Sequence, residues 1–183
     1  MGTQIMTLAD EYDRLCRTPS DINEHLPTFL NLVLCLNAQH VIELGTRSGV
    51  STVAWLYGLL KTGGRLTSVD LDGEPFDAHD AWTFIQGDDL DPAVTVQLDP
   101  ADIVFIDTSH TYPQTVAELN LYRWLVKPGG LIVCHDTELA HPADAPARPA
   151  FPVKTAIEEF TEANGYRWIN HPNCNGLGII EGF

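Results

Sequence analysis

Short apolar segments recur along the chain, and each one is followed by a glycine or ends in an acidic residue. They are HVIEL (40–44), RLTSVDLD (65–72), WTFIQ (82–86), ADIVFID (101–107) and LIVCHD (131–136). Helical patterns over 50–60, 112–126 and 153–163 alternate with them. Apolar strands that do not alternate with polar residues, separated by helices, are typical of a parallel sheet covered on both faces. The pattern therefore predicts an α/β fold.

Two helices are expected before the first of these strands. The first spans 8–17 and stops at Thr18-Pro19. The second is predicted to begin at Ser20 or Asp21, since Glu24 stands at capping-box distance from Asp21. One buried face of this second helix is formed by Leu26, Leu30, Val33 and Leu34.

The end of the sequence predicts a change of strand direction. The segments 166–169 and 177–180 are strand-like and joined by a loop with Pro172 and Gly176, so we expect an antiparallel hairpin. The connection between the second and third strands is too short for a full crossover helix. We interpret the chain as one domain, in which N-terminal helices (1–36) precede the sheet core (37–183).

The charge of the chain excludes some partners. Asp and Glu number 25 against 10 Lys and Arg, a net charge of -15. Such a surface repels phosphate backbones and acidic lipids, so we expect no nucleic-acid and no membrane partner. Four cysteines without a C-x-x-C pair, and an acidic rather than basic start, predict neither a disulfide framework nor a signal peptide. A cytoplasmic protein is expected.

The segment 41–51, VIELGTRSGVS, carries the strongest local signal. A strand enters a turn at Gly45, where the backbone can approach a ligand closely, and a helix begins at about Gly49 with unpaired N–H groups. The lysine of a triphosphate-binding loop is absent. A dinucleotide fingerprint also fails, because Arg47 and Gly49 do not complete G-x-G-x-x-G.

Acidic residues end the following strands. Asp70 could accept hydrogen bonds from a ribose diol, Asp88 could meet an adenine amino group, and Asp107 ends the fourth strand. Each acid alone could be a helix cap or a solvated charge. Together they predict a ligand pocket at the carboxyl edge of the sheet, beside the proline-rich segment 137–152.

Four segments, IELGTRSGVST, SVDLD, IQGDD and FIDTSHTYPQTVAELNLYRWLVKPGGLIVCHD, resemble class I S-adenosylmethionine-dependent methyltransferases. More narrowly, they are similar to the small-molecule and sugar O-methyltransferase group that includes cephalosporin-hydroxylase-like proteins. The resemblance runs from about Asn37 to the last residue. It implies a Rossmann-like, seven-stranded, mostly parallel sheet with a C-terminal antiparallel hairpin and helices on both faces.

The resemblance also implies residue roles. Gly45, Thr46 and Gly49 would line the methionine part of S-adenosylmethionine, and Glu43 would steady that loop or the amino-acid moiety. Arg47 departs from the commonest E-x-G-x-G-x-G form of the motif. The full set assigned to the cofactor is Glu43, Gly45, Thr46, Gly49, Ser51, Asp70, Leu71, Asp88 and Asp107.

Two chemical roles are expected at the ends of the fourth and fifth strands. His110, with Asp107, is the candidate that removes a proton from the attacking hydroxyl, given the ordinary pKa of about 6.5 for a histidine; the alternative is a helix-capping histidine before Tyr112. Asp107, Asp136 and His135 could hold Mg²⁺. Alternatively, His135 and Asp136 belong to the cofactor pocket or orient the base.

The leading hypothesis is an O-methyltransferase that acts on a hydroxyl group of a small molecule such as a sugar or a natural-product glycoside. Two alternatives stay open, a dinucleotide-dependent oxidoreductase and a non-catalytic cofactor-binding partner subunit. The acceptor pocket is expected to depend on the proline-rich loop, the N-terminal helix or a second subunit, so a homodimer is one option.

Overall fold

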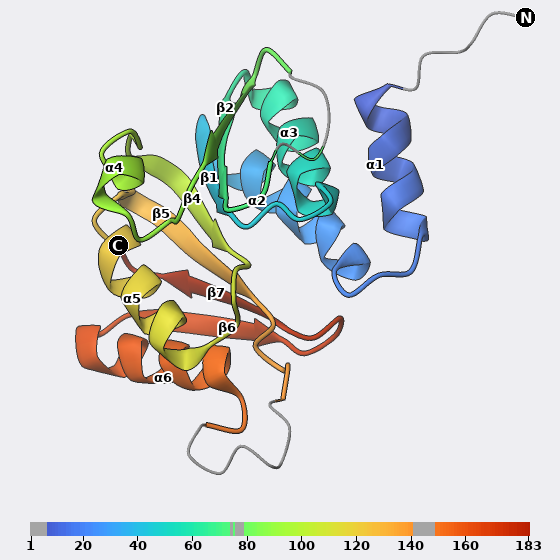
Figure 1. Ribbon diagram of the computed structural model, residues 1–183. Coiled ribbons are helices and arrows are strands. Elements are labelled where there is room, and N and C mark those ends of the chain that lie inside the picture. Colours follow the sequence, from blue (N-terminus) through green and yellow to red (C-terminus); the bar gives the residue numbers. More distant parts are fainter. Residues whose placement is uncertain (1–6, 74, 76–78, 141–148) are drawn as a thin grey trace, which may run out of the picture.

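The computed structural model describes residues 7–73, 75, 79–140 and 149–183, and its seven strands form one sheet in the order β3-β2-β1-β4-β5-β7-β6 (Figure 1). All neighbouring strands are parallel except that β7 runs antiparallel to both β5 and β6. This confirms the predicted fold, including the C-terminal hairpin. The strands are β1 (His40–Leu44), β2 (Arg65–Asp70), β3 (Trp82–Gln86), β4 (Ala101–Ile106), β5 (Val126–His135), β6 (Arg167–His171) and β7 (Leu177–Glu181).

Helices cover both faces of the sheet, because both sides of its central strands are apolar. In β4, Phe105 packs into the core under α1, α2 and α3, whereas Val104 packs into the core under α5 and α6. β1 divides in the same way. The helices are α1 (Leu8–Arg17), α2 (Leu26–Leu36), α3 (Val50–Thr62), α4 (Pro92–Thr95), α5 (Tyr112–Tyr122) and α6 (Pro152–Asn164), with a 3-10 turn, η1 (Asn23–His25), before α2.

The predicted capping box at Asp21 and Glu24 is wrong. The capping box of this region belongs to α1 instead, where Thr7 and Asp10 exchange hydrogen bonds. Asp21 pairs with Arg47, and Glu24 accepts a hydrogen bond from Asn173. Their side chains are therefore taken by tertiary contacts, and η1 leads directly into α2.

The buried face of α2 also differs from the prediction at one position. Leu26 and Val33 are fully buried as expected, and Phe29 joins them. Leu34 is 43% exposed. The face that packs against α3 is rotated slightly toward Phe29, whose ring stacks on Trp55 with centroids 4.4 Å apart.

The boundary between α5 and β5 was misplaced in the sequence prediction. α5 ends at Tyr122, and Trp124, which falls within the predicted helical segment 112–126, is 74% exposed. β5 begins at Val126, which pairs with Ala101, and the register shifts before Leu131 pairs with Ile103. Gly129 and Gly130, which follow the predicted helical segment, lie within β5, where a Cβ at Gly130 would lie 2.6 Å from the Asp102 carbonyl oxygen.

The short connection between β2 and β3 contains no helix among its described residues, as predicted. Pro142 and Pro146 of the predicted proline-rich loop lie outside the described residues. The helices of the described part of the chain include none that is long and apolar enough to cross a membrane.

Candidate functional site

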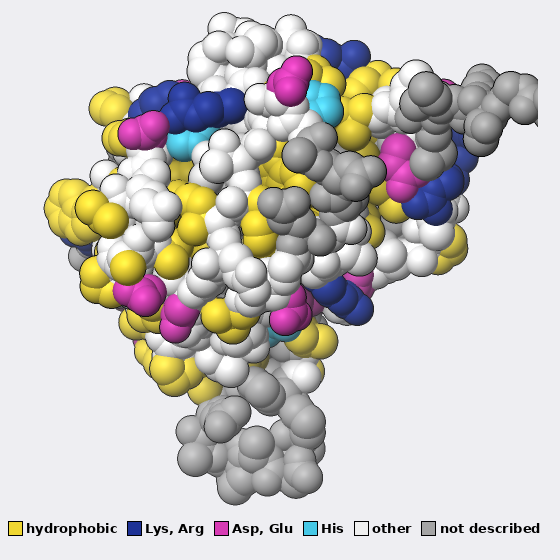
Figure 2. Space-filling model, turned by 45° about the horizontal axis from the view of Figure 1, so that its top comes forward, with side chains coloured by type: hydrophobic (Ala, Val, Ile, Leu, Met, Phe, Trp, Pro, Cys, Tyr) yellow, Lys and Arg dark blue, Asp and Glu magenta, His cyan; other side chains and the backbone are white. Residues whose placement is uncertain are grey.

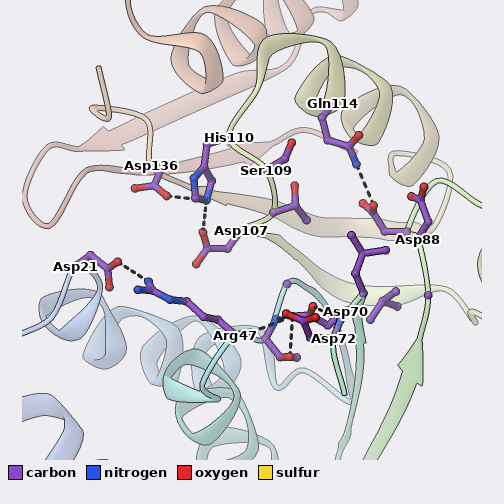
Figure 3. A pocket seen from close by; sticks show the side chains of 17 residues that line it. Asp21, Arg47, Asp70, Asp72, Asp88, Asp107, Ser109, His110, Gln114 and Asp136 are labelled. Atoms are coloured by element: carbon purple, nitrogen blue, oxygen red, sulfur yellow. Dashed lines mark hydrogen bonds and ion pairs between the residues drawn. The ribbon is translucent and has the colours of Figure 1, made fainter. Parts of the chain in front are cut away.

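A pocket of about 490 Å³ opens at the carboxyl edge of the sheet, where the ends of β1, β2, β3, β4 and β5 meet (Figure 3). Its volume is within the usual range of small-molecule sites. The residues that line it are Asp21, Gly45, Thr46, Arg47, Val69, Asp70, Leu71, Asp72, Gly87, Asp88, Asp89, Asp107, Thr108, Ser109, His110, Gln114 and Asp136.

Most of the predicted site residues lie in this pocket, but some do not. The predicted residues that line it are Gly45, Thr46, Asp70, Leu71, Asp88, Asp107, His110 and Asp136. Glu43, Gly49, Ser51 and His135 are not among the lining residues, and their assigned contacts with a cofactor or metal stay predictions. Sequence reasoning gave no ligand role to Asp21, Asp72 or Gln114. Asp72 follows shortly after β2, whereas the approach of Asp21 and Gln114 to the strand ends depends on tertiary packing.

The turn after β1 is held against the ends of β2 and β4. Gly45 has a φ of +85°, and a Cβ there would lie 2.0 Å from the Asp107 carbonyl oxygen. Only glycine fits this close approach. Asp70 Oδ2 accepts hydrogen bonds from the backbone N–H groups of Thr46 (2.6 Å) and Arg47 (3.0 Å). The predicted ribose-binding carboxylate thus also fixes the shape of the loop.

Glu43 is a structural acid directly beneath the pocket. Its side chain is fully buried and accepts hydrogen bonds from Ser51 (2.6 Å), Thr52 (2.8 Å) and Ser68 (2.7 Å). Burial raises the pKa of Glu43 to about 7 against the lowering effect of these hydroxyl groups. Glu43 therefore ties the first turn of α3 to β2, and the two roles expected for it toward the loop or the cofactor stay predictions.

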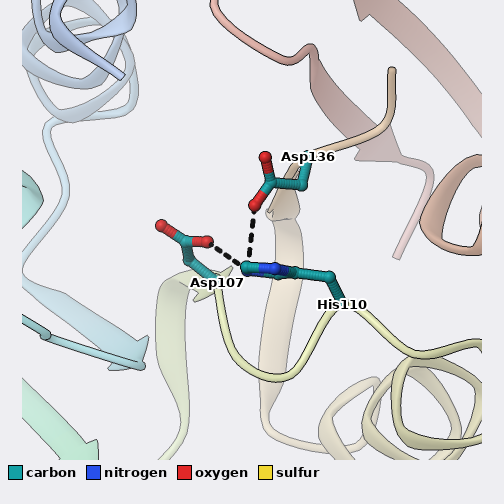
Figure 4. Close-up of side chains that lie close together, drawn as sticks. All are labelled: Asp107, His110 and Asp136. Atoms are coloured by element: carbon teal, nitrogen blue, oxygen red, sulfur yellow. Dashed lines mark hydrogen bonds and ion pairs between the residues drawn. The ribbon is translucent and has the colours of Figure 1, made fainter. Parts of the chain in front are cut away.

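Two carboxylates and two imidazoles form the cluster at the ends of β4 and β5. Figure 4 shows three of the four side chains, Asp107, His110 and Asp136. His110 Nε2 lies 3.1 Å from Asp107 Oδ1 and 2.8 Å from Asp136 Oδ2. His135 Nδ1 lies 3.3 Å from Asp136 Oδ2. Its Nε2 is within hydrogen-bond distance of the carbonyl oxygens of Asp21 (3.1 Å) and Cys174 (3.0 Å).

The charges in this cluster balance one another. Burial alone would lower the pKa of His110, but its contacts with Asp107 and Asp136 outweigh burial and raise the pKa to about 9. The same two carboxylates raise the pKa of His135 to about 10, and the two histidines hold the pKa of Asp136 well below its usual range despite burial. The expectation that His110 has an ordinary pKa is therefore wrong: in this arrangement both imidazoles carry a proton at neutral pH.

The cluster can also supply metal ligands. Asp107, His110 and Asp136 each offer one ligand atom, and these atoms lie within 4.8 Å of one another. Asp136 Oδ1 is buried and has no hydrogen-bond partner among the described residues. A divalent cation would satisfy that oxygen, so the donor set fits one. This group contains His110, for which sequence reasoning expected proton removal, and the metal contact expected for His135 stays a prediction.

A second pair of buried acids lies behind the opposite end of the pocket. Asp89 and Glu118 are both buried, and burial raises the pKa of each. Gln114 Nε2 donates to both of them at 3.0 Å, and Asp88 Oδ1 accepts from the Leu90 N–H. This end offers carboxylate and amide groups to a ligand that has hydrogen-bond donors.

The fold and the pocket together define a class I methyltransferase-like protein, with strands whose carboxyl ends carry a glycine turn and a row of acids. The chain belongs to the methyltransferase domain family, whose model matches residues 42–137. This confirms the class that the sequence motifs resembled. The narrower sugar O-methyltransferase group stays a prediction.

Individual relatives agree with this assignment. O-methyltransferase ankF from Aspergillus thermomutatus is 26% identical over 110 residues, which are 55% of this chain and 46% of ankF. The chain thus spans about half the length of this curated relative.

Solved structures share the fold. The O-methyltransferase TomG from Streptomyces achromogenes, involved in tomaymycin synthesis and bound to S-adenosylmethionine, superposes with a TM-score of 0.68 at 18% identity, covering 98% of this chain and 90% of TomG. A putative caffeoyl-CoA O-methyltransferase from Staphylococcus aureus superposes with a TM-score of 0.70 at 16% identity, covering 98% of this chain and 94% of the Staphylococcus aureus chain.

Proposed function

We propose that the protein is an S-adenosylmethionine-dependent O-methyltransferase. The observation that carries the proposal is the pocket itself, in which the Gly45 turn, Asp70, Asp88 and the Asp107–His110–Asp136 cluster face one space (Figure 3). Family membership and the relative ankF support the reaction class. The absence of a dinucleotide fingerprint speaks against the oxidoreductase alternative.

The cofactor is proposed to lie along the strand ends. Asp70 is the candidate for the ribose hydroxyls, and Asp88 for the adenine amino group, in line with the pattern of acids in α/β nucleotide sites. The methionine part would follow the turn at Gly45 and Thr46. S-adenosylmethionine supplies a methyl group on a positively charged sulfur, next to which the carboxylate of Asp107 is favourable.

Methyl transfer needs the acceptor oxygen to be aligned with the methyl–sulfur bond and to lose its proton. His110 lies at the pocket wall with Asp107 and Asp136 on its Nε2 side (Figure 4). These carboxylates orient the ring. His110 is the candidate that receives the hydroxyl proton, and the Asp107 and Asp136 side chains are its positioning groups. Because these carboxylates raise the pKa of His110 to about 9, His110 can accept this proton only in its neutral form, whose share grows as the pH rises toward 9.

A divalent cation such as Mg²⁺ is a further proposal. Asp107, His110 and Asp136 would hold it, supported by the unpartnered Asp136 Oδ1. His110 would give up its Nε2 proton to bind the ion, so the metal site is an alternative to the role of His110 as the base. When bound, such an ion would lower the pKa of a coordinated acceptor hydroxyl.

The acceptor is proposed to be a hydroxylated small molecule, with a sugar or a natural-product glycoside as the first class to examine.

Calorimetry with S-adenosylmethionine and with NAD tests the cofactor assignment. Binding of S-adenosylmethionine but not of NAD is expected, and no binding of S-adenosylmethionine would overturn the proposal.

Hydroxylated acceptors should then be screened for transfer of a labelled methyl group, with His110→Ala as the catalytic variant. Full turnover by this variant with normal cofactor binding would remove His110 from the mechanism. Undiminished activity after exhaustive EDTA treatment would remove the metal.

A further inference from the structure

The charges that line the pocket single out Arg47. Seven of the lining residues are aspartates, and the cationic side chains among them are Arg47 and His110. His110 is engaged by two carboxylates. Arg47 has one ion-pair partner among the described residues, Asp21, with Nη1 and Oδ2 2.8 Å apart. A ligand carboxylate entering this pocket would meet repulsion everywhere except near these two cations.

The backbone fixes where the Arg47 side chain begins. Its N–H donates to Asp70 Oδ2 at 3.0 Å, and its φ of +46° is unusual for a residue other than glycine. From this turn the side chain extends toward Asp21, away from the end of the pocket that holds Asp88 and Gln114 (Figure 3). The guanidinium group therefore lies beyond the turn, at the end of the pocket opposite the proposed adenine site.

We propose that Arg47 binds the α-carboxylate of the methionine moiety of S-adenosylmethionine. This inference rests on the proposed function, which places adenosine at Asp70 and Asp88 and the amino-acid end at the turn. Asp21 demonstrates that the guanidinium group holds a carboxylate at this position. Because the side chains of Arg47 and Asp21 are 83% and 44% exposed, the pair is weak and a ligand carboxylate can replace Asp21.

The geometry of arginine favours this exchange. A guanidinium group can bind a carboxylate through two parallel hydrogen bonds, which is stronger than a single contact. A glycine at position 47, as in the commonest form of the motif, has no side chain to make such a contact. The contact is therefore specific to this form of the turn.

The test compares two ligands that differ only in the carboxylate, S-adenosylmethionine and decarboxylated S-adenosylmethionine. Measured by calorimetry, the Arg47→Ala variant should bind S-adenosylmethionine about tenfold more weakly than the unchanged protein. The affinity for the decarboxylated ligand should stay the same. Arg47→Lys should recover part of the loss, since it restores the charge without the bidentate geometry.

Arg167→Ala is the matched control. Arg167 forms an ion pair with Glu181 in which the side chains are 81% and 40% exposed, close to the exposure of the Arg47 pair, and it does not line the pocket. Arg167→Ala removes the same charge as Arg47→Ala, and it should change the affinity neither for S-adenosylmethionine nor for the decarboxylated ligand. If Arg47→Ala weakened the binding of both ligands equally, or weakened the binding of neither, this inference would be overturned but the proposed function would stand. Failure of the unchanged protein to bind either ligand would overturn the proposed function and this inference with it.

Discussion

Gly45 lies where the chain leaves β1, with its Cα facing the backbone of Asp107. Gly63, at the end of α3, has a similar φ of +75° but nothing within 4 Å of the position of a Cβ. Substituting alanine at each of these two positions therefore distinguishes the free-energy cost of a left-handed backbone from that of a steric clash.

Gly63→Ala should lower the free energy of unfolding by about 1 kcal/mol, the cost of a left-handed backbone in alanine. Gly45→Ala should lower it by about 3 kcal/mol, because the added methyl group also displaces Asp107. Urea unfolding measures both values. Similar values for the two variants would contradict the close approach of Gly45 to β4.

Glu43 makes the stability of the fold depend on pH. Its pKa is about 7 in the folded protein against a normal value of 4.5, so the folded state binds more protons than the unfolded state between these values. The stabilising contribution is complete below about pH 4.5 and is lost as pH rises through about 7, a change of about 3 kcal/mol.

Glu43→Gln should remove this dependence. The amide can still accept from Thr52 and Ser68 and can donate to Ser51, so the variant is expected to fold. Chemical unfolding at a series of pH values should give a difference between variant and unchanged protein that grows from about pH 4.5 to about pH 7. A constant difference over this range would show that Glu43 titrates normally.

At the scale of elements, α2 and α3 pack closely because α3 carries a glycine at their contact. A Cβ at Gly58 would lie 3.0 Å from Val33 Cβ. Gly58→Ala gains helix propensity, about 1 kcal/mol, but it overpacks the contact by about 1–3 kcal/mol. The net result should be destabilising.

A double-mutant cycle tests this contact. In a Val33→Ala background the contacts of the added methyl group with the two Val33 Cγ atoms, at 3.2 and 3.3 Å, disappear while the Cβ contact stays. The same Gly58→Ala change should therefore become less destabilising. A coupling free energy of about 1–3 kcal/mol is expected from urea unfolding of the four proteins. Independent effects of the two substitutions would show that the helices can move apart without cost.

The sequence predicts elements best where burial alone defines them. β1 and β4 are mostly apolar and were placed from their composition. The start of β5 was missed because Pro128 and Gly129 are typical of a helix end, whereas they lie between Val126 and Leu131, which both pair with β4, and the Gly129 N–H donates to the Phe183 carbonyl oxygen. The capping box at Asp21 failed for a related reason, since Arg47 competes for the carboxylate.

The same distinction applies to the site. Asp70, Asp107 and Asp136 could be predicted because parallel strands bring their carboxyl ends to one edge. The protonation of His110 could not, because it arises from two carboxylates on different strands. Asp21 and Gln114 belong to segments outside the strands, and only the packing of those segments brings them to the pocket.

For the whole molecule, the excess of acidic residues lowers the free energy of unfolding. Lys and Arg lie in small separate groups on the face in Figure 2 rather than in a continuous basic surface. With a net charge of -15, repulsion among the acids opposes the compact state. Part of this acidity lies in the pocket, where Asp107 and Asp136 are balanced by two histidines.

The melting temperature should therefore rise with ionic strength. Raising NaCl from about 0.01 M to about 0.15 M shortens the Debye length from about 30 Å to about 8 Å and screens the repulsion. Differential scanning calorimetry should record a higher Tm in the more concentrated salt, and an equal effect of KCl would exclude a specific role of sodium. A Tm that falls in both salts would mean that screened ion pairs outweigh the repulsion.

His135 joins parts of the chain that are far apart in sequence. Its Nε2 contacts the carbonyl oxygens of Asp21 and Cys174, and the neighbouring His25 contacts that of Asn173. The turn before β7 and the segment before α2 are thus fastened to the same point as the carboxylate cluster. In native-state hydrogen exchange they should open as one cooperative unit. An engineer who removes the N-terminal helices to obtain a smaller protein would therefore loosen the Asp107–His110–Asp136 cluster itself.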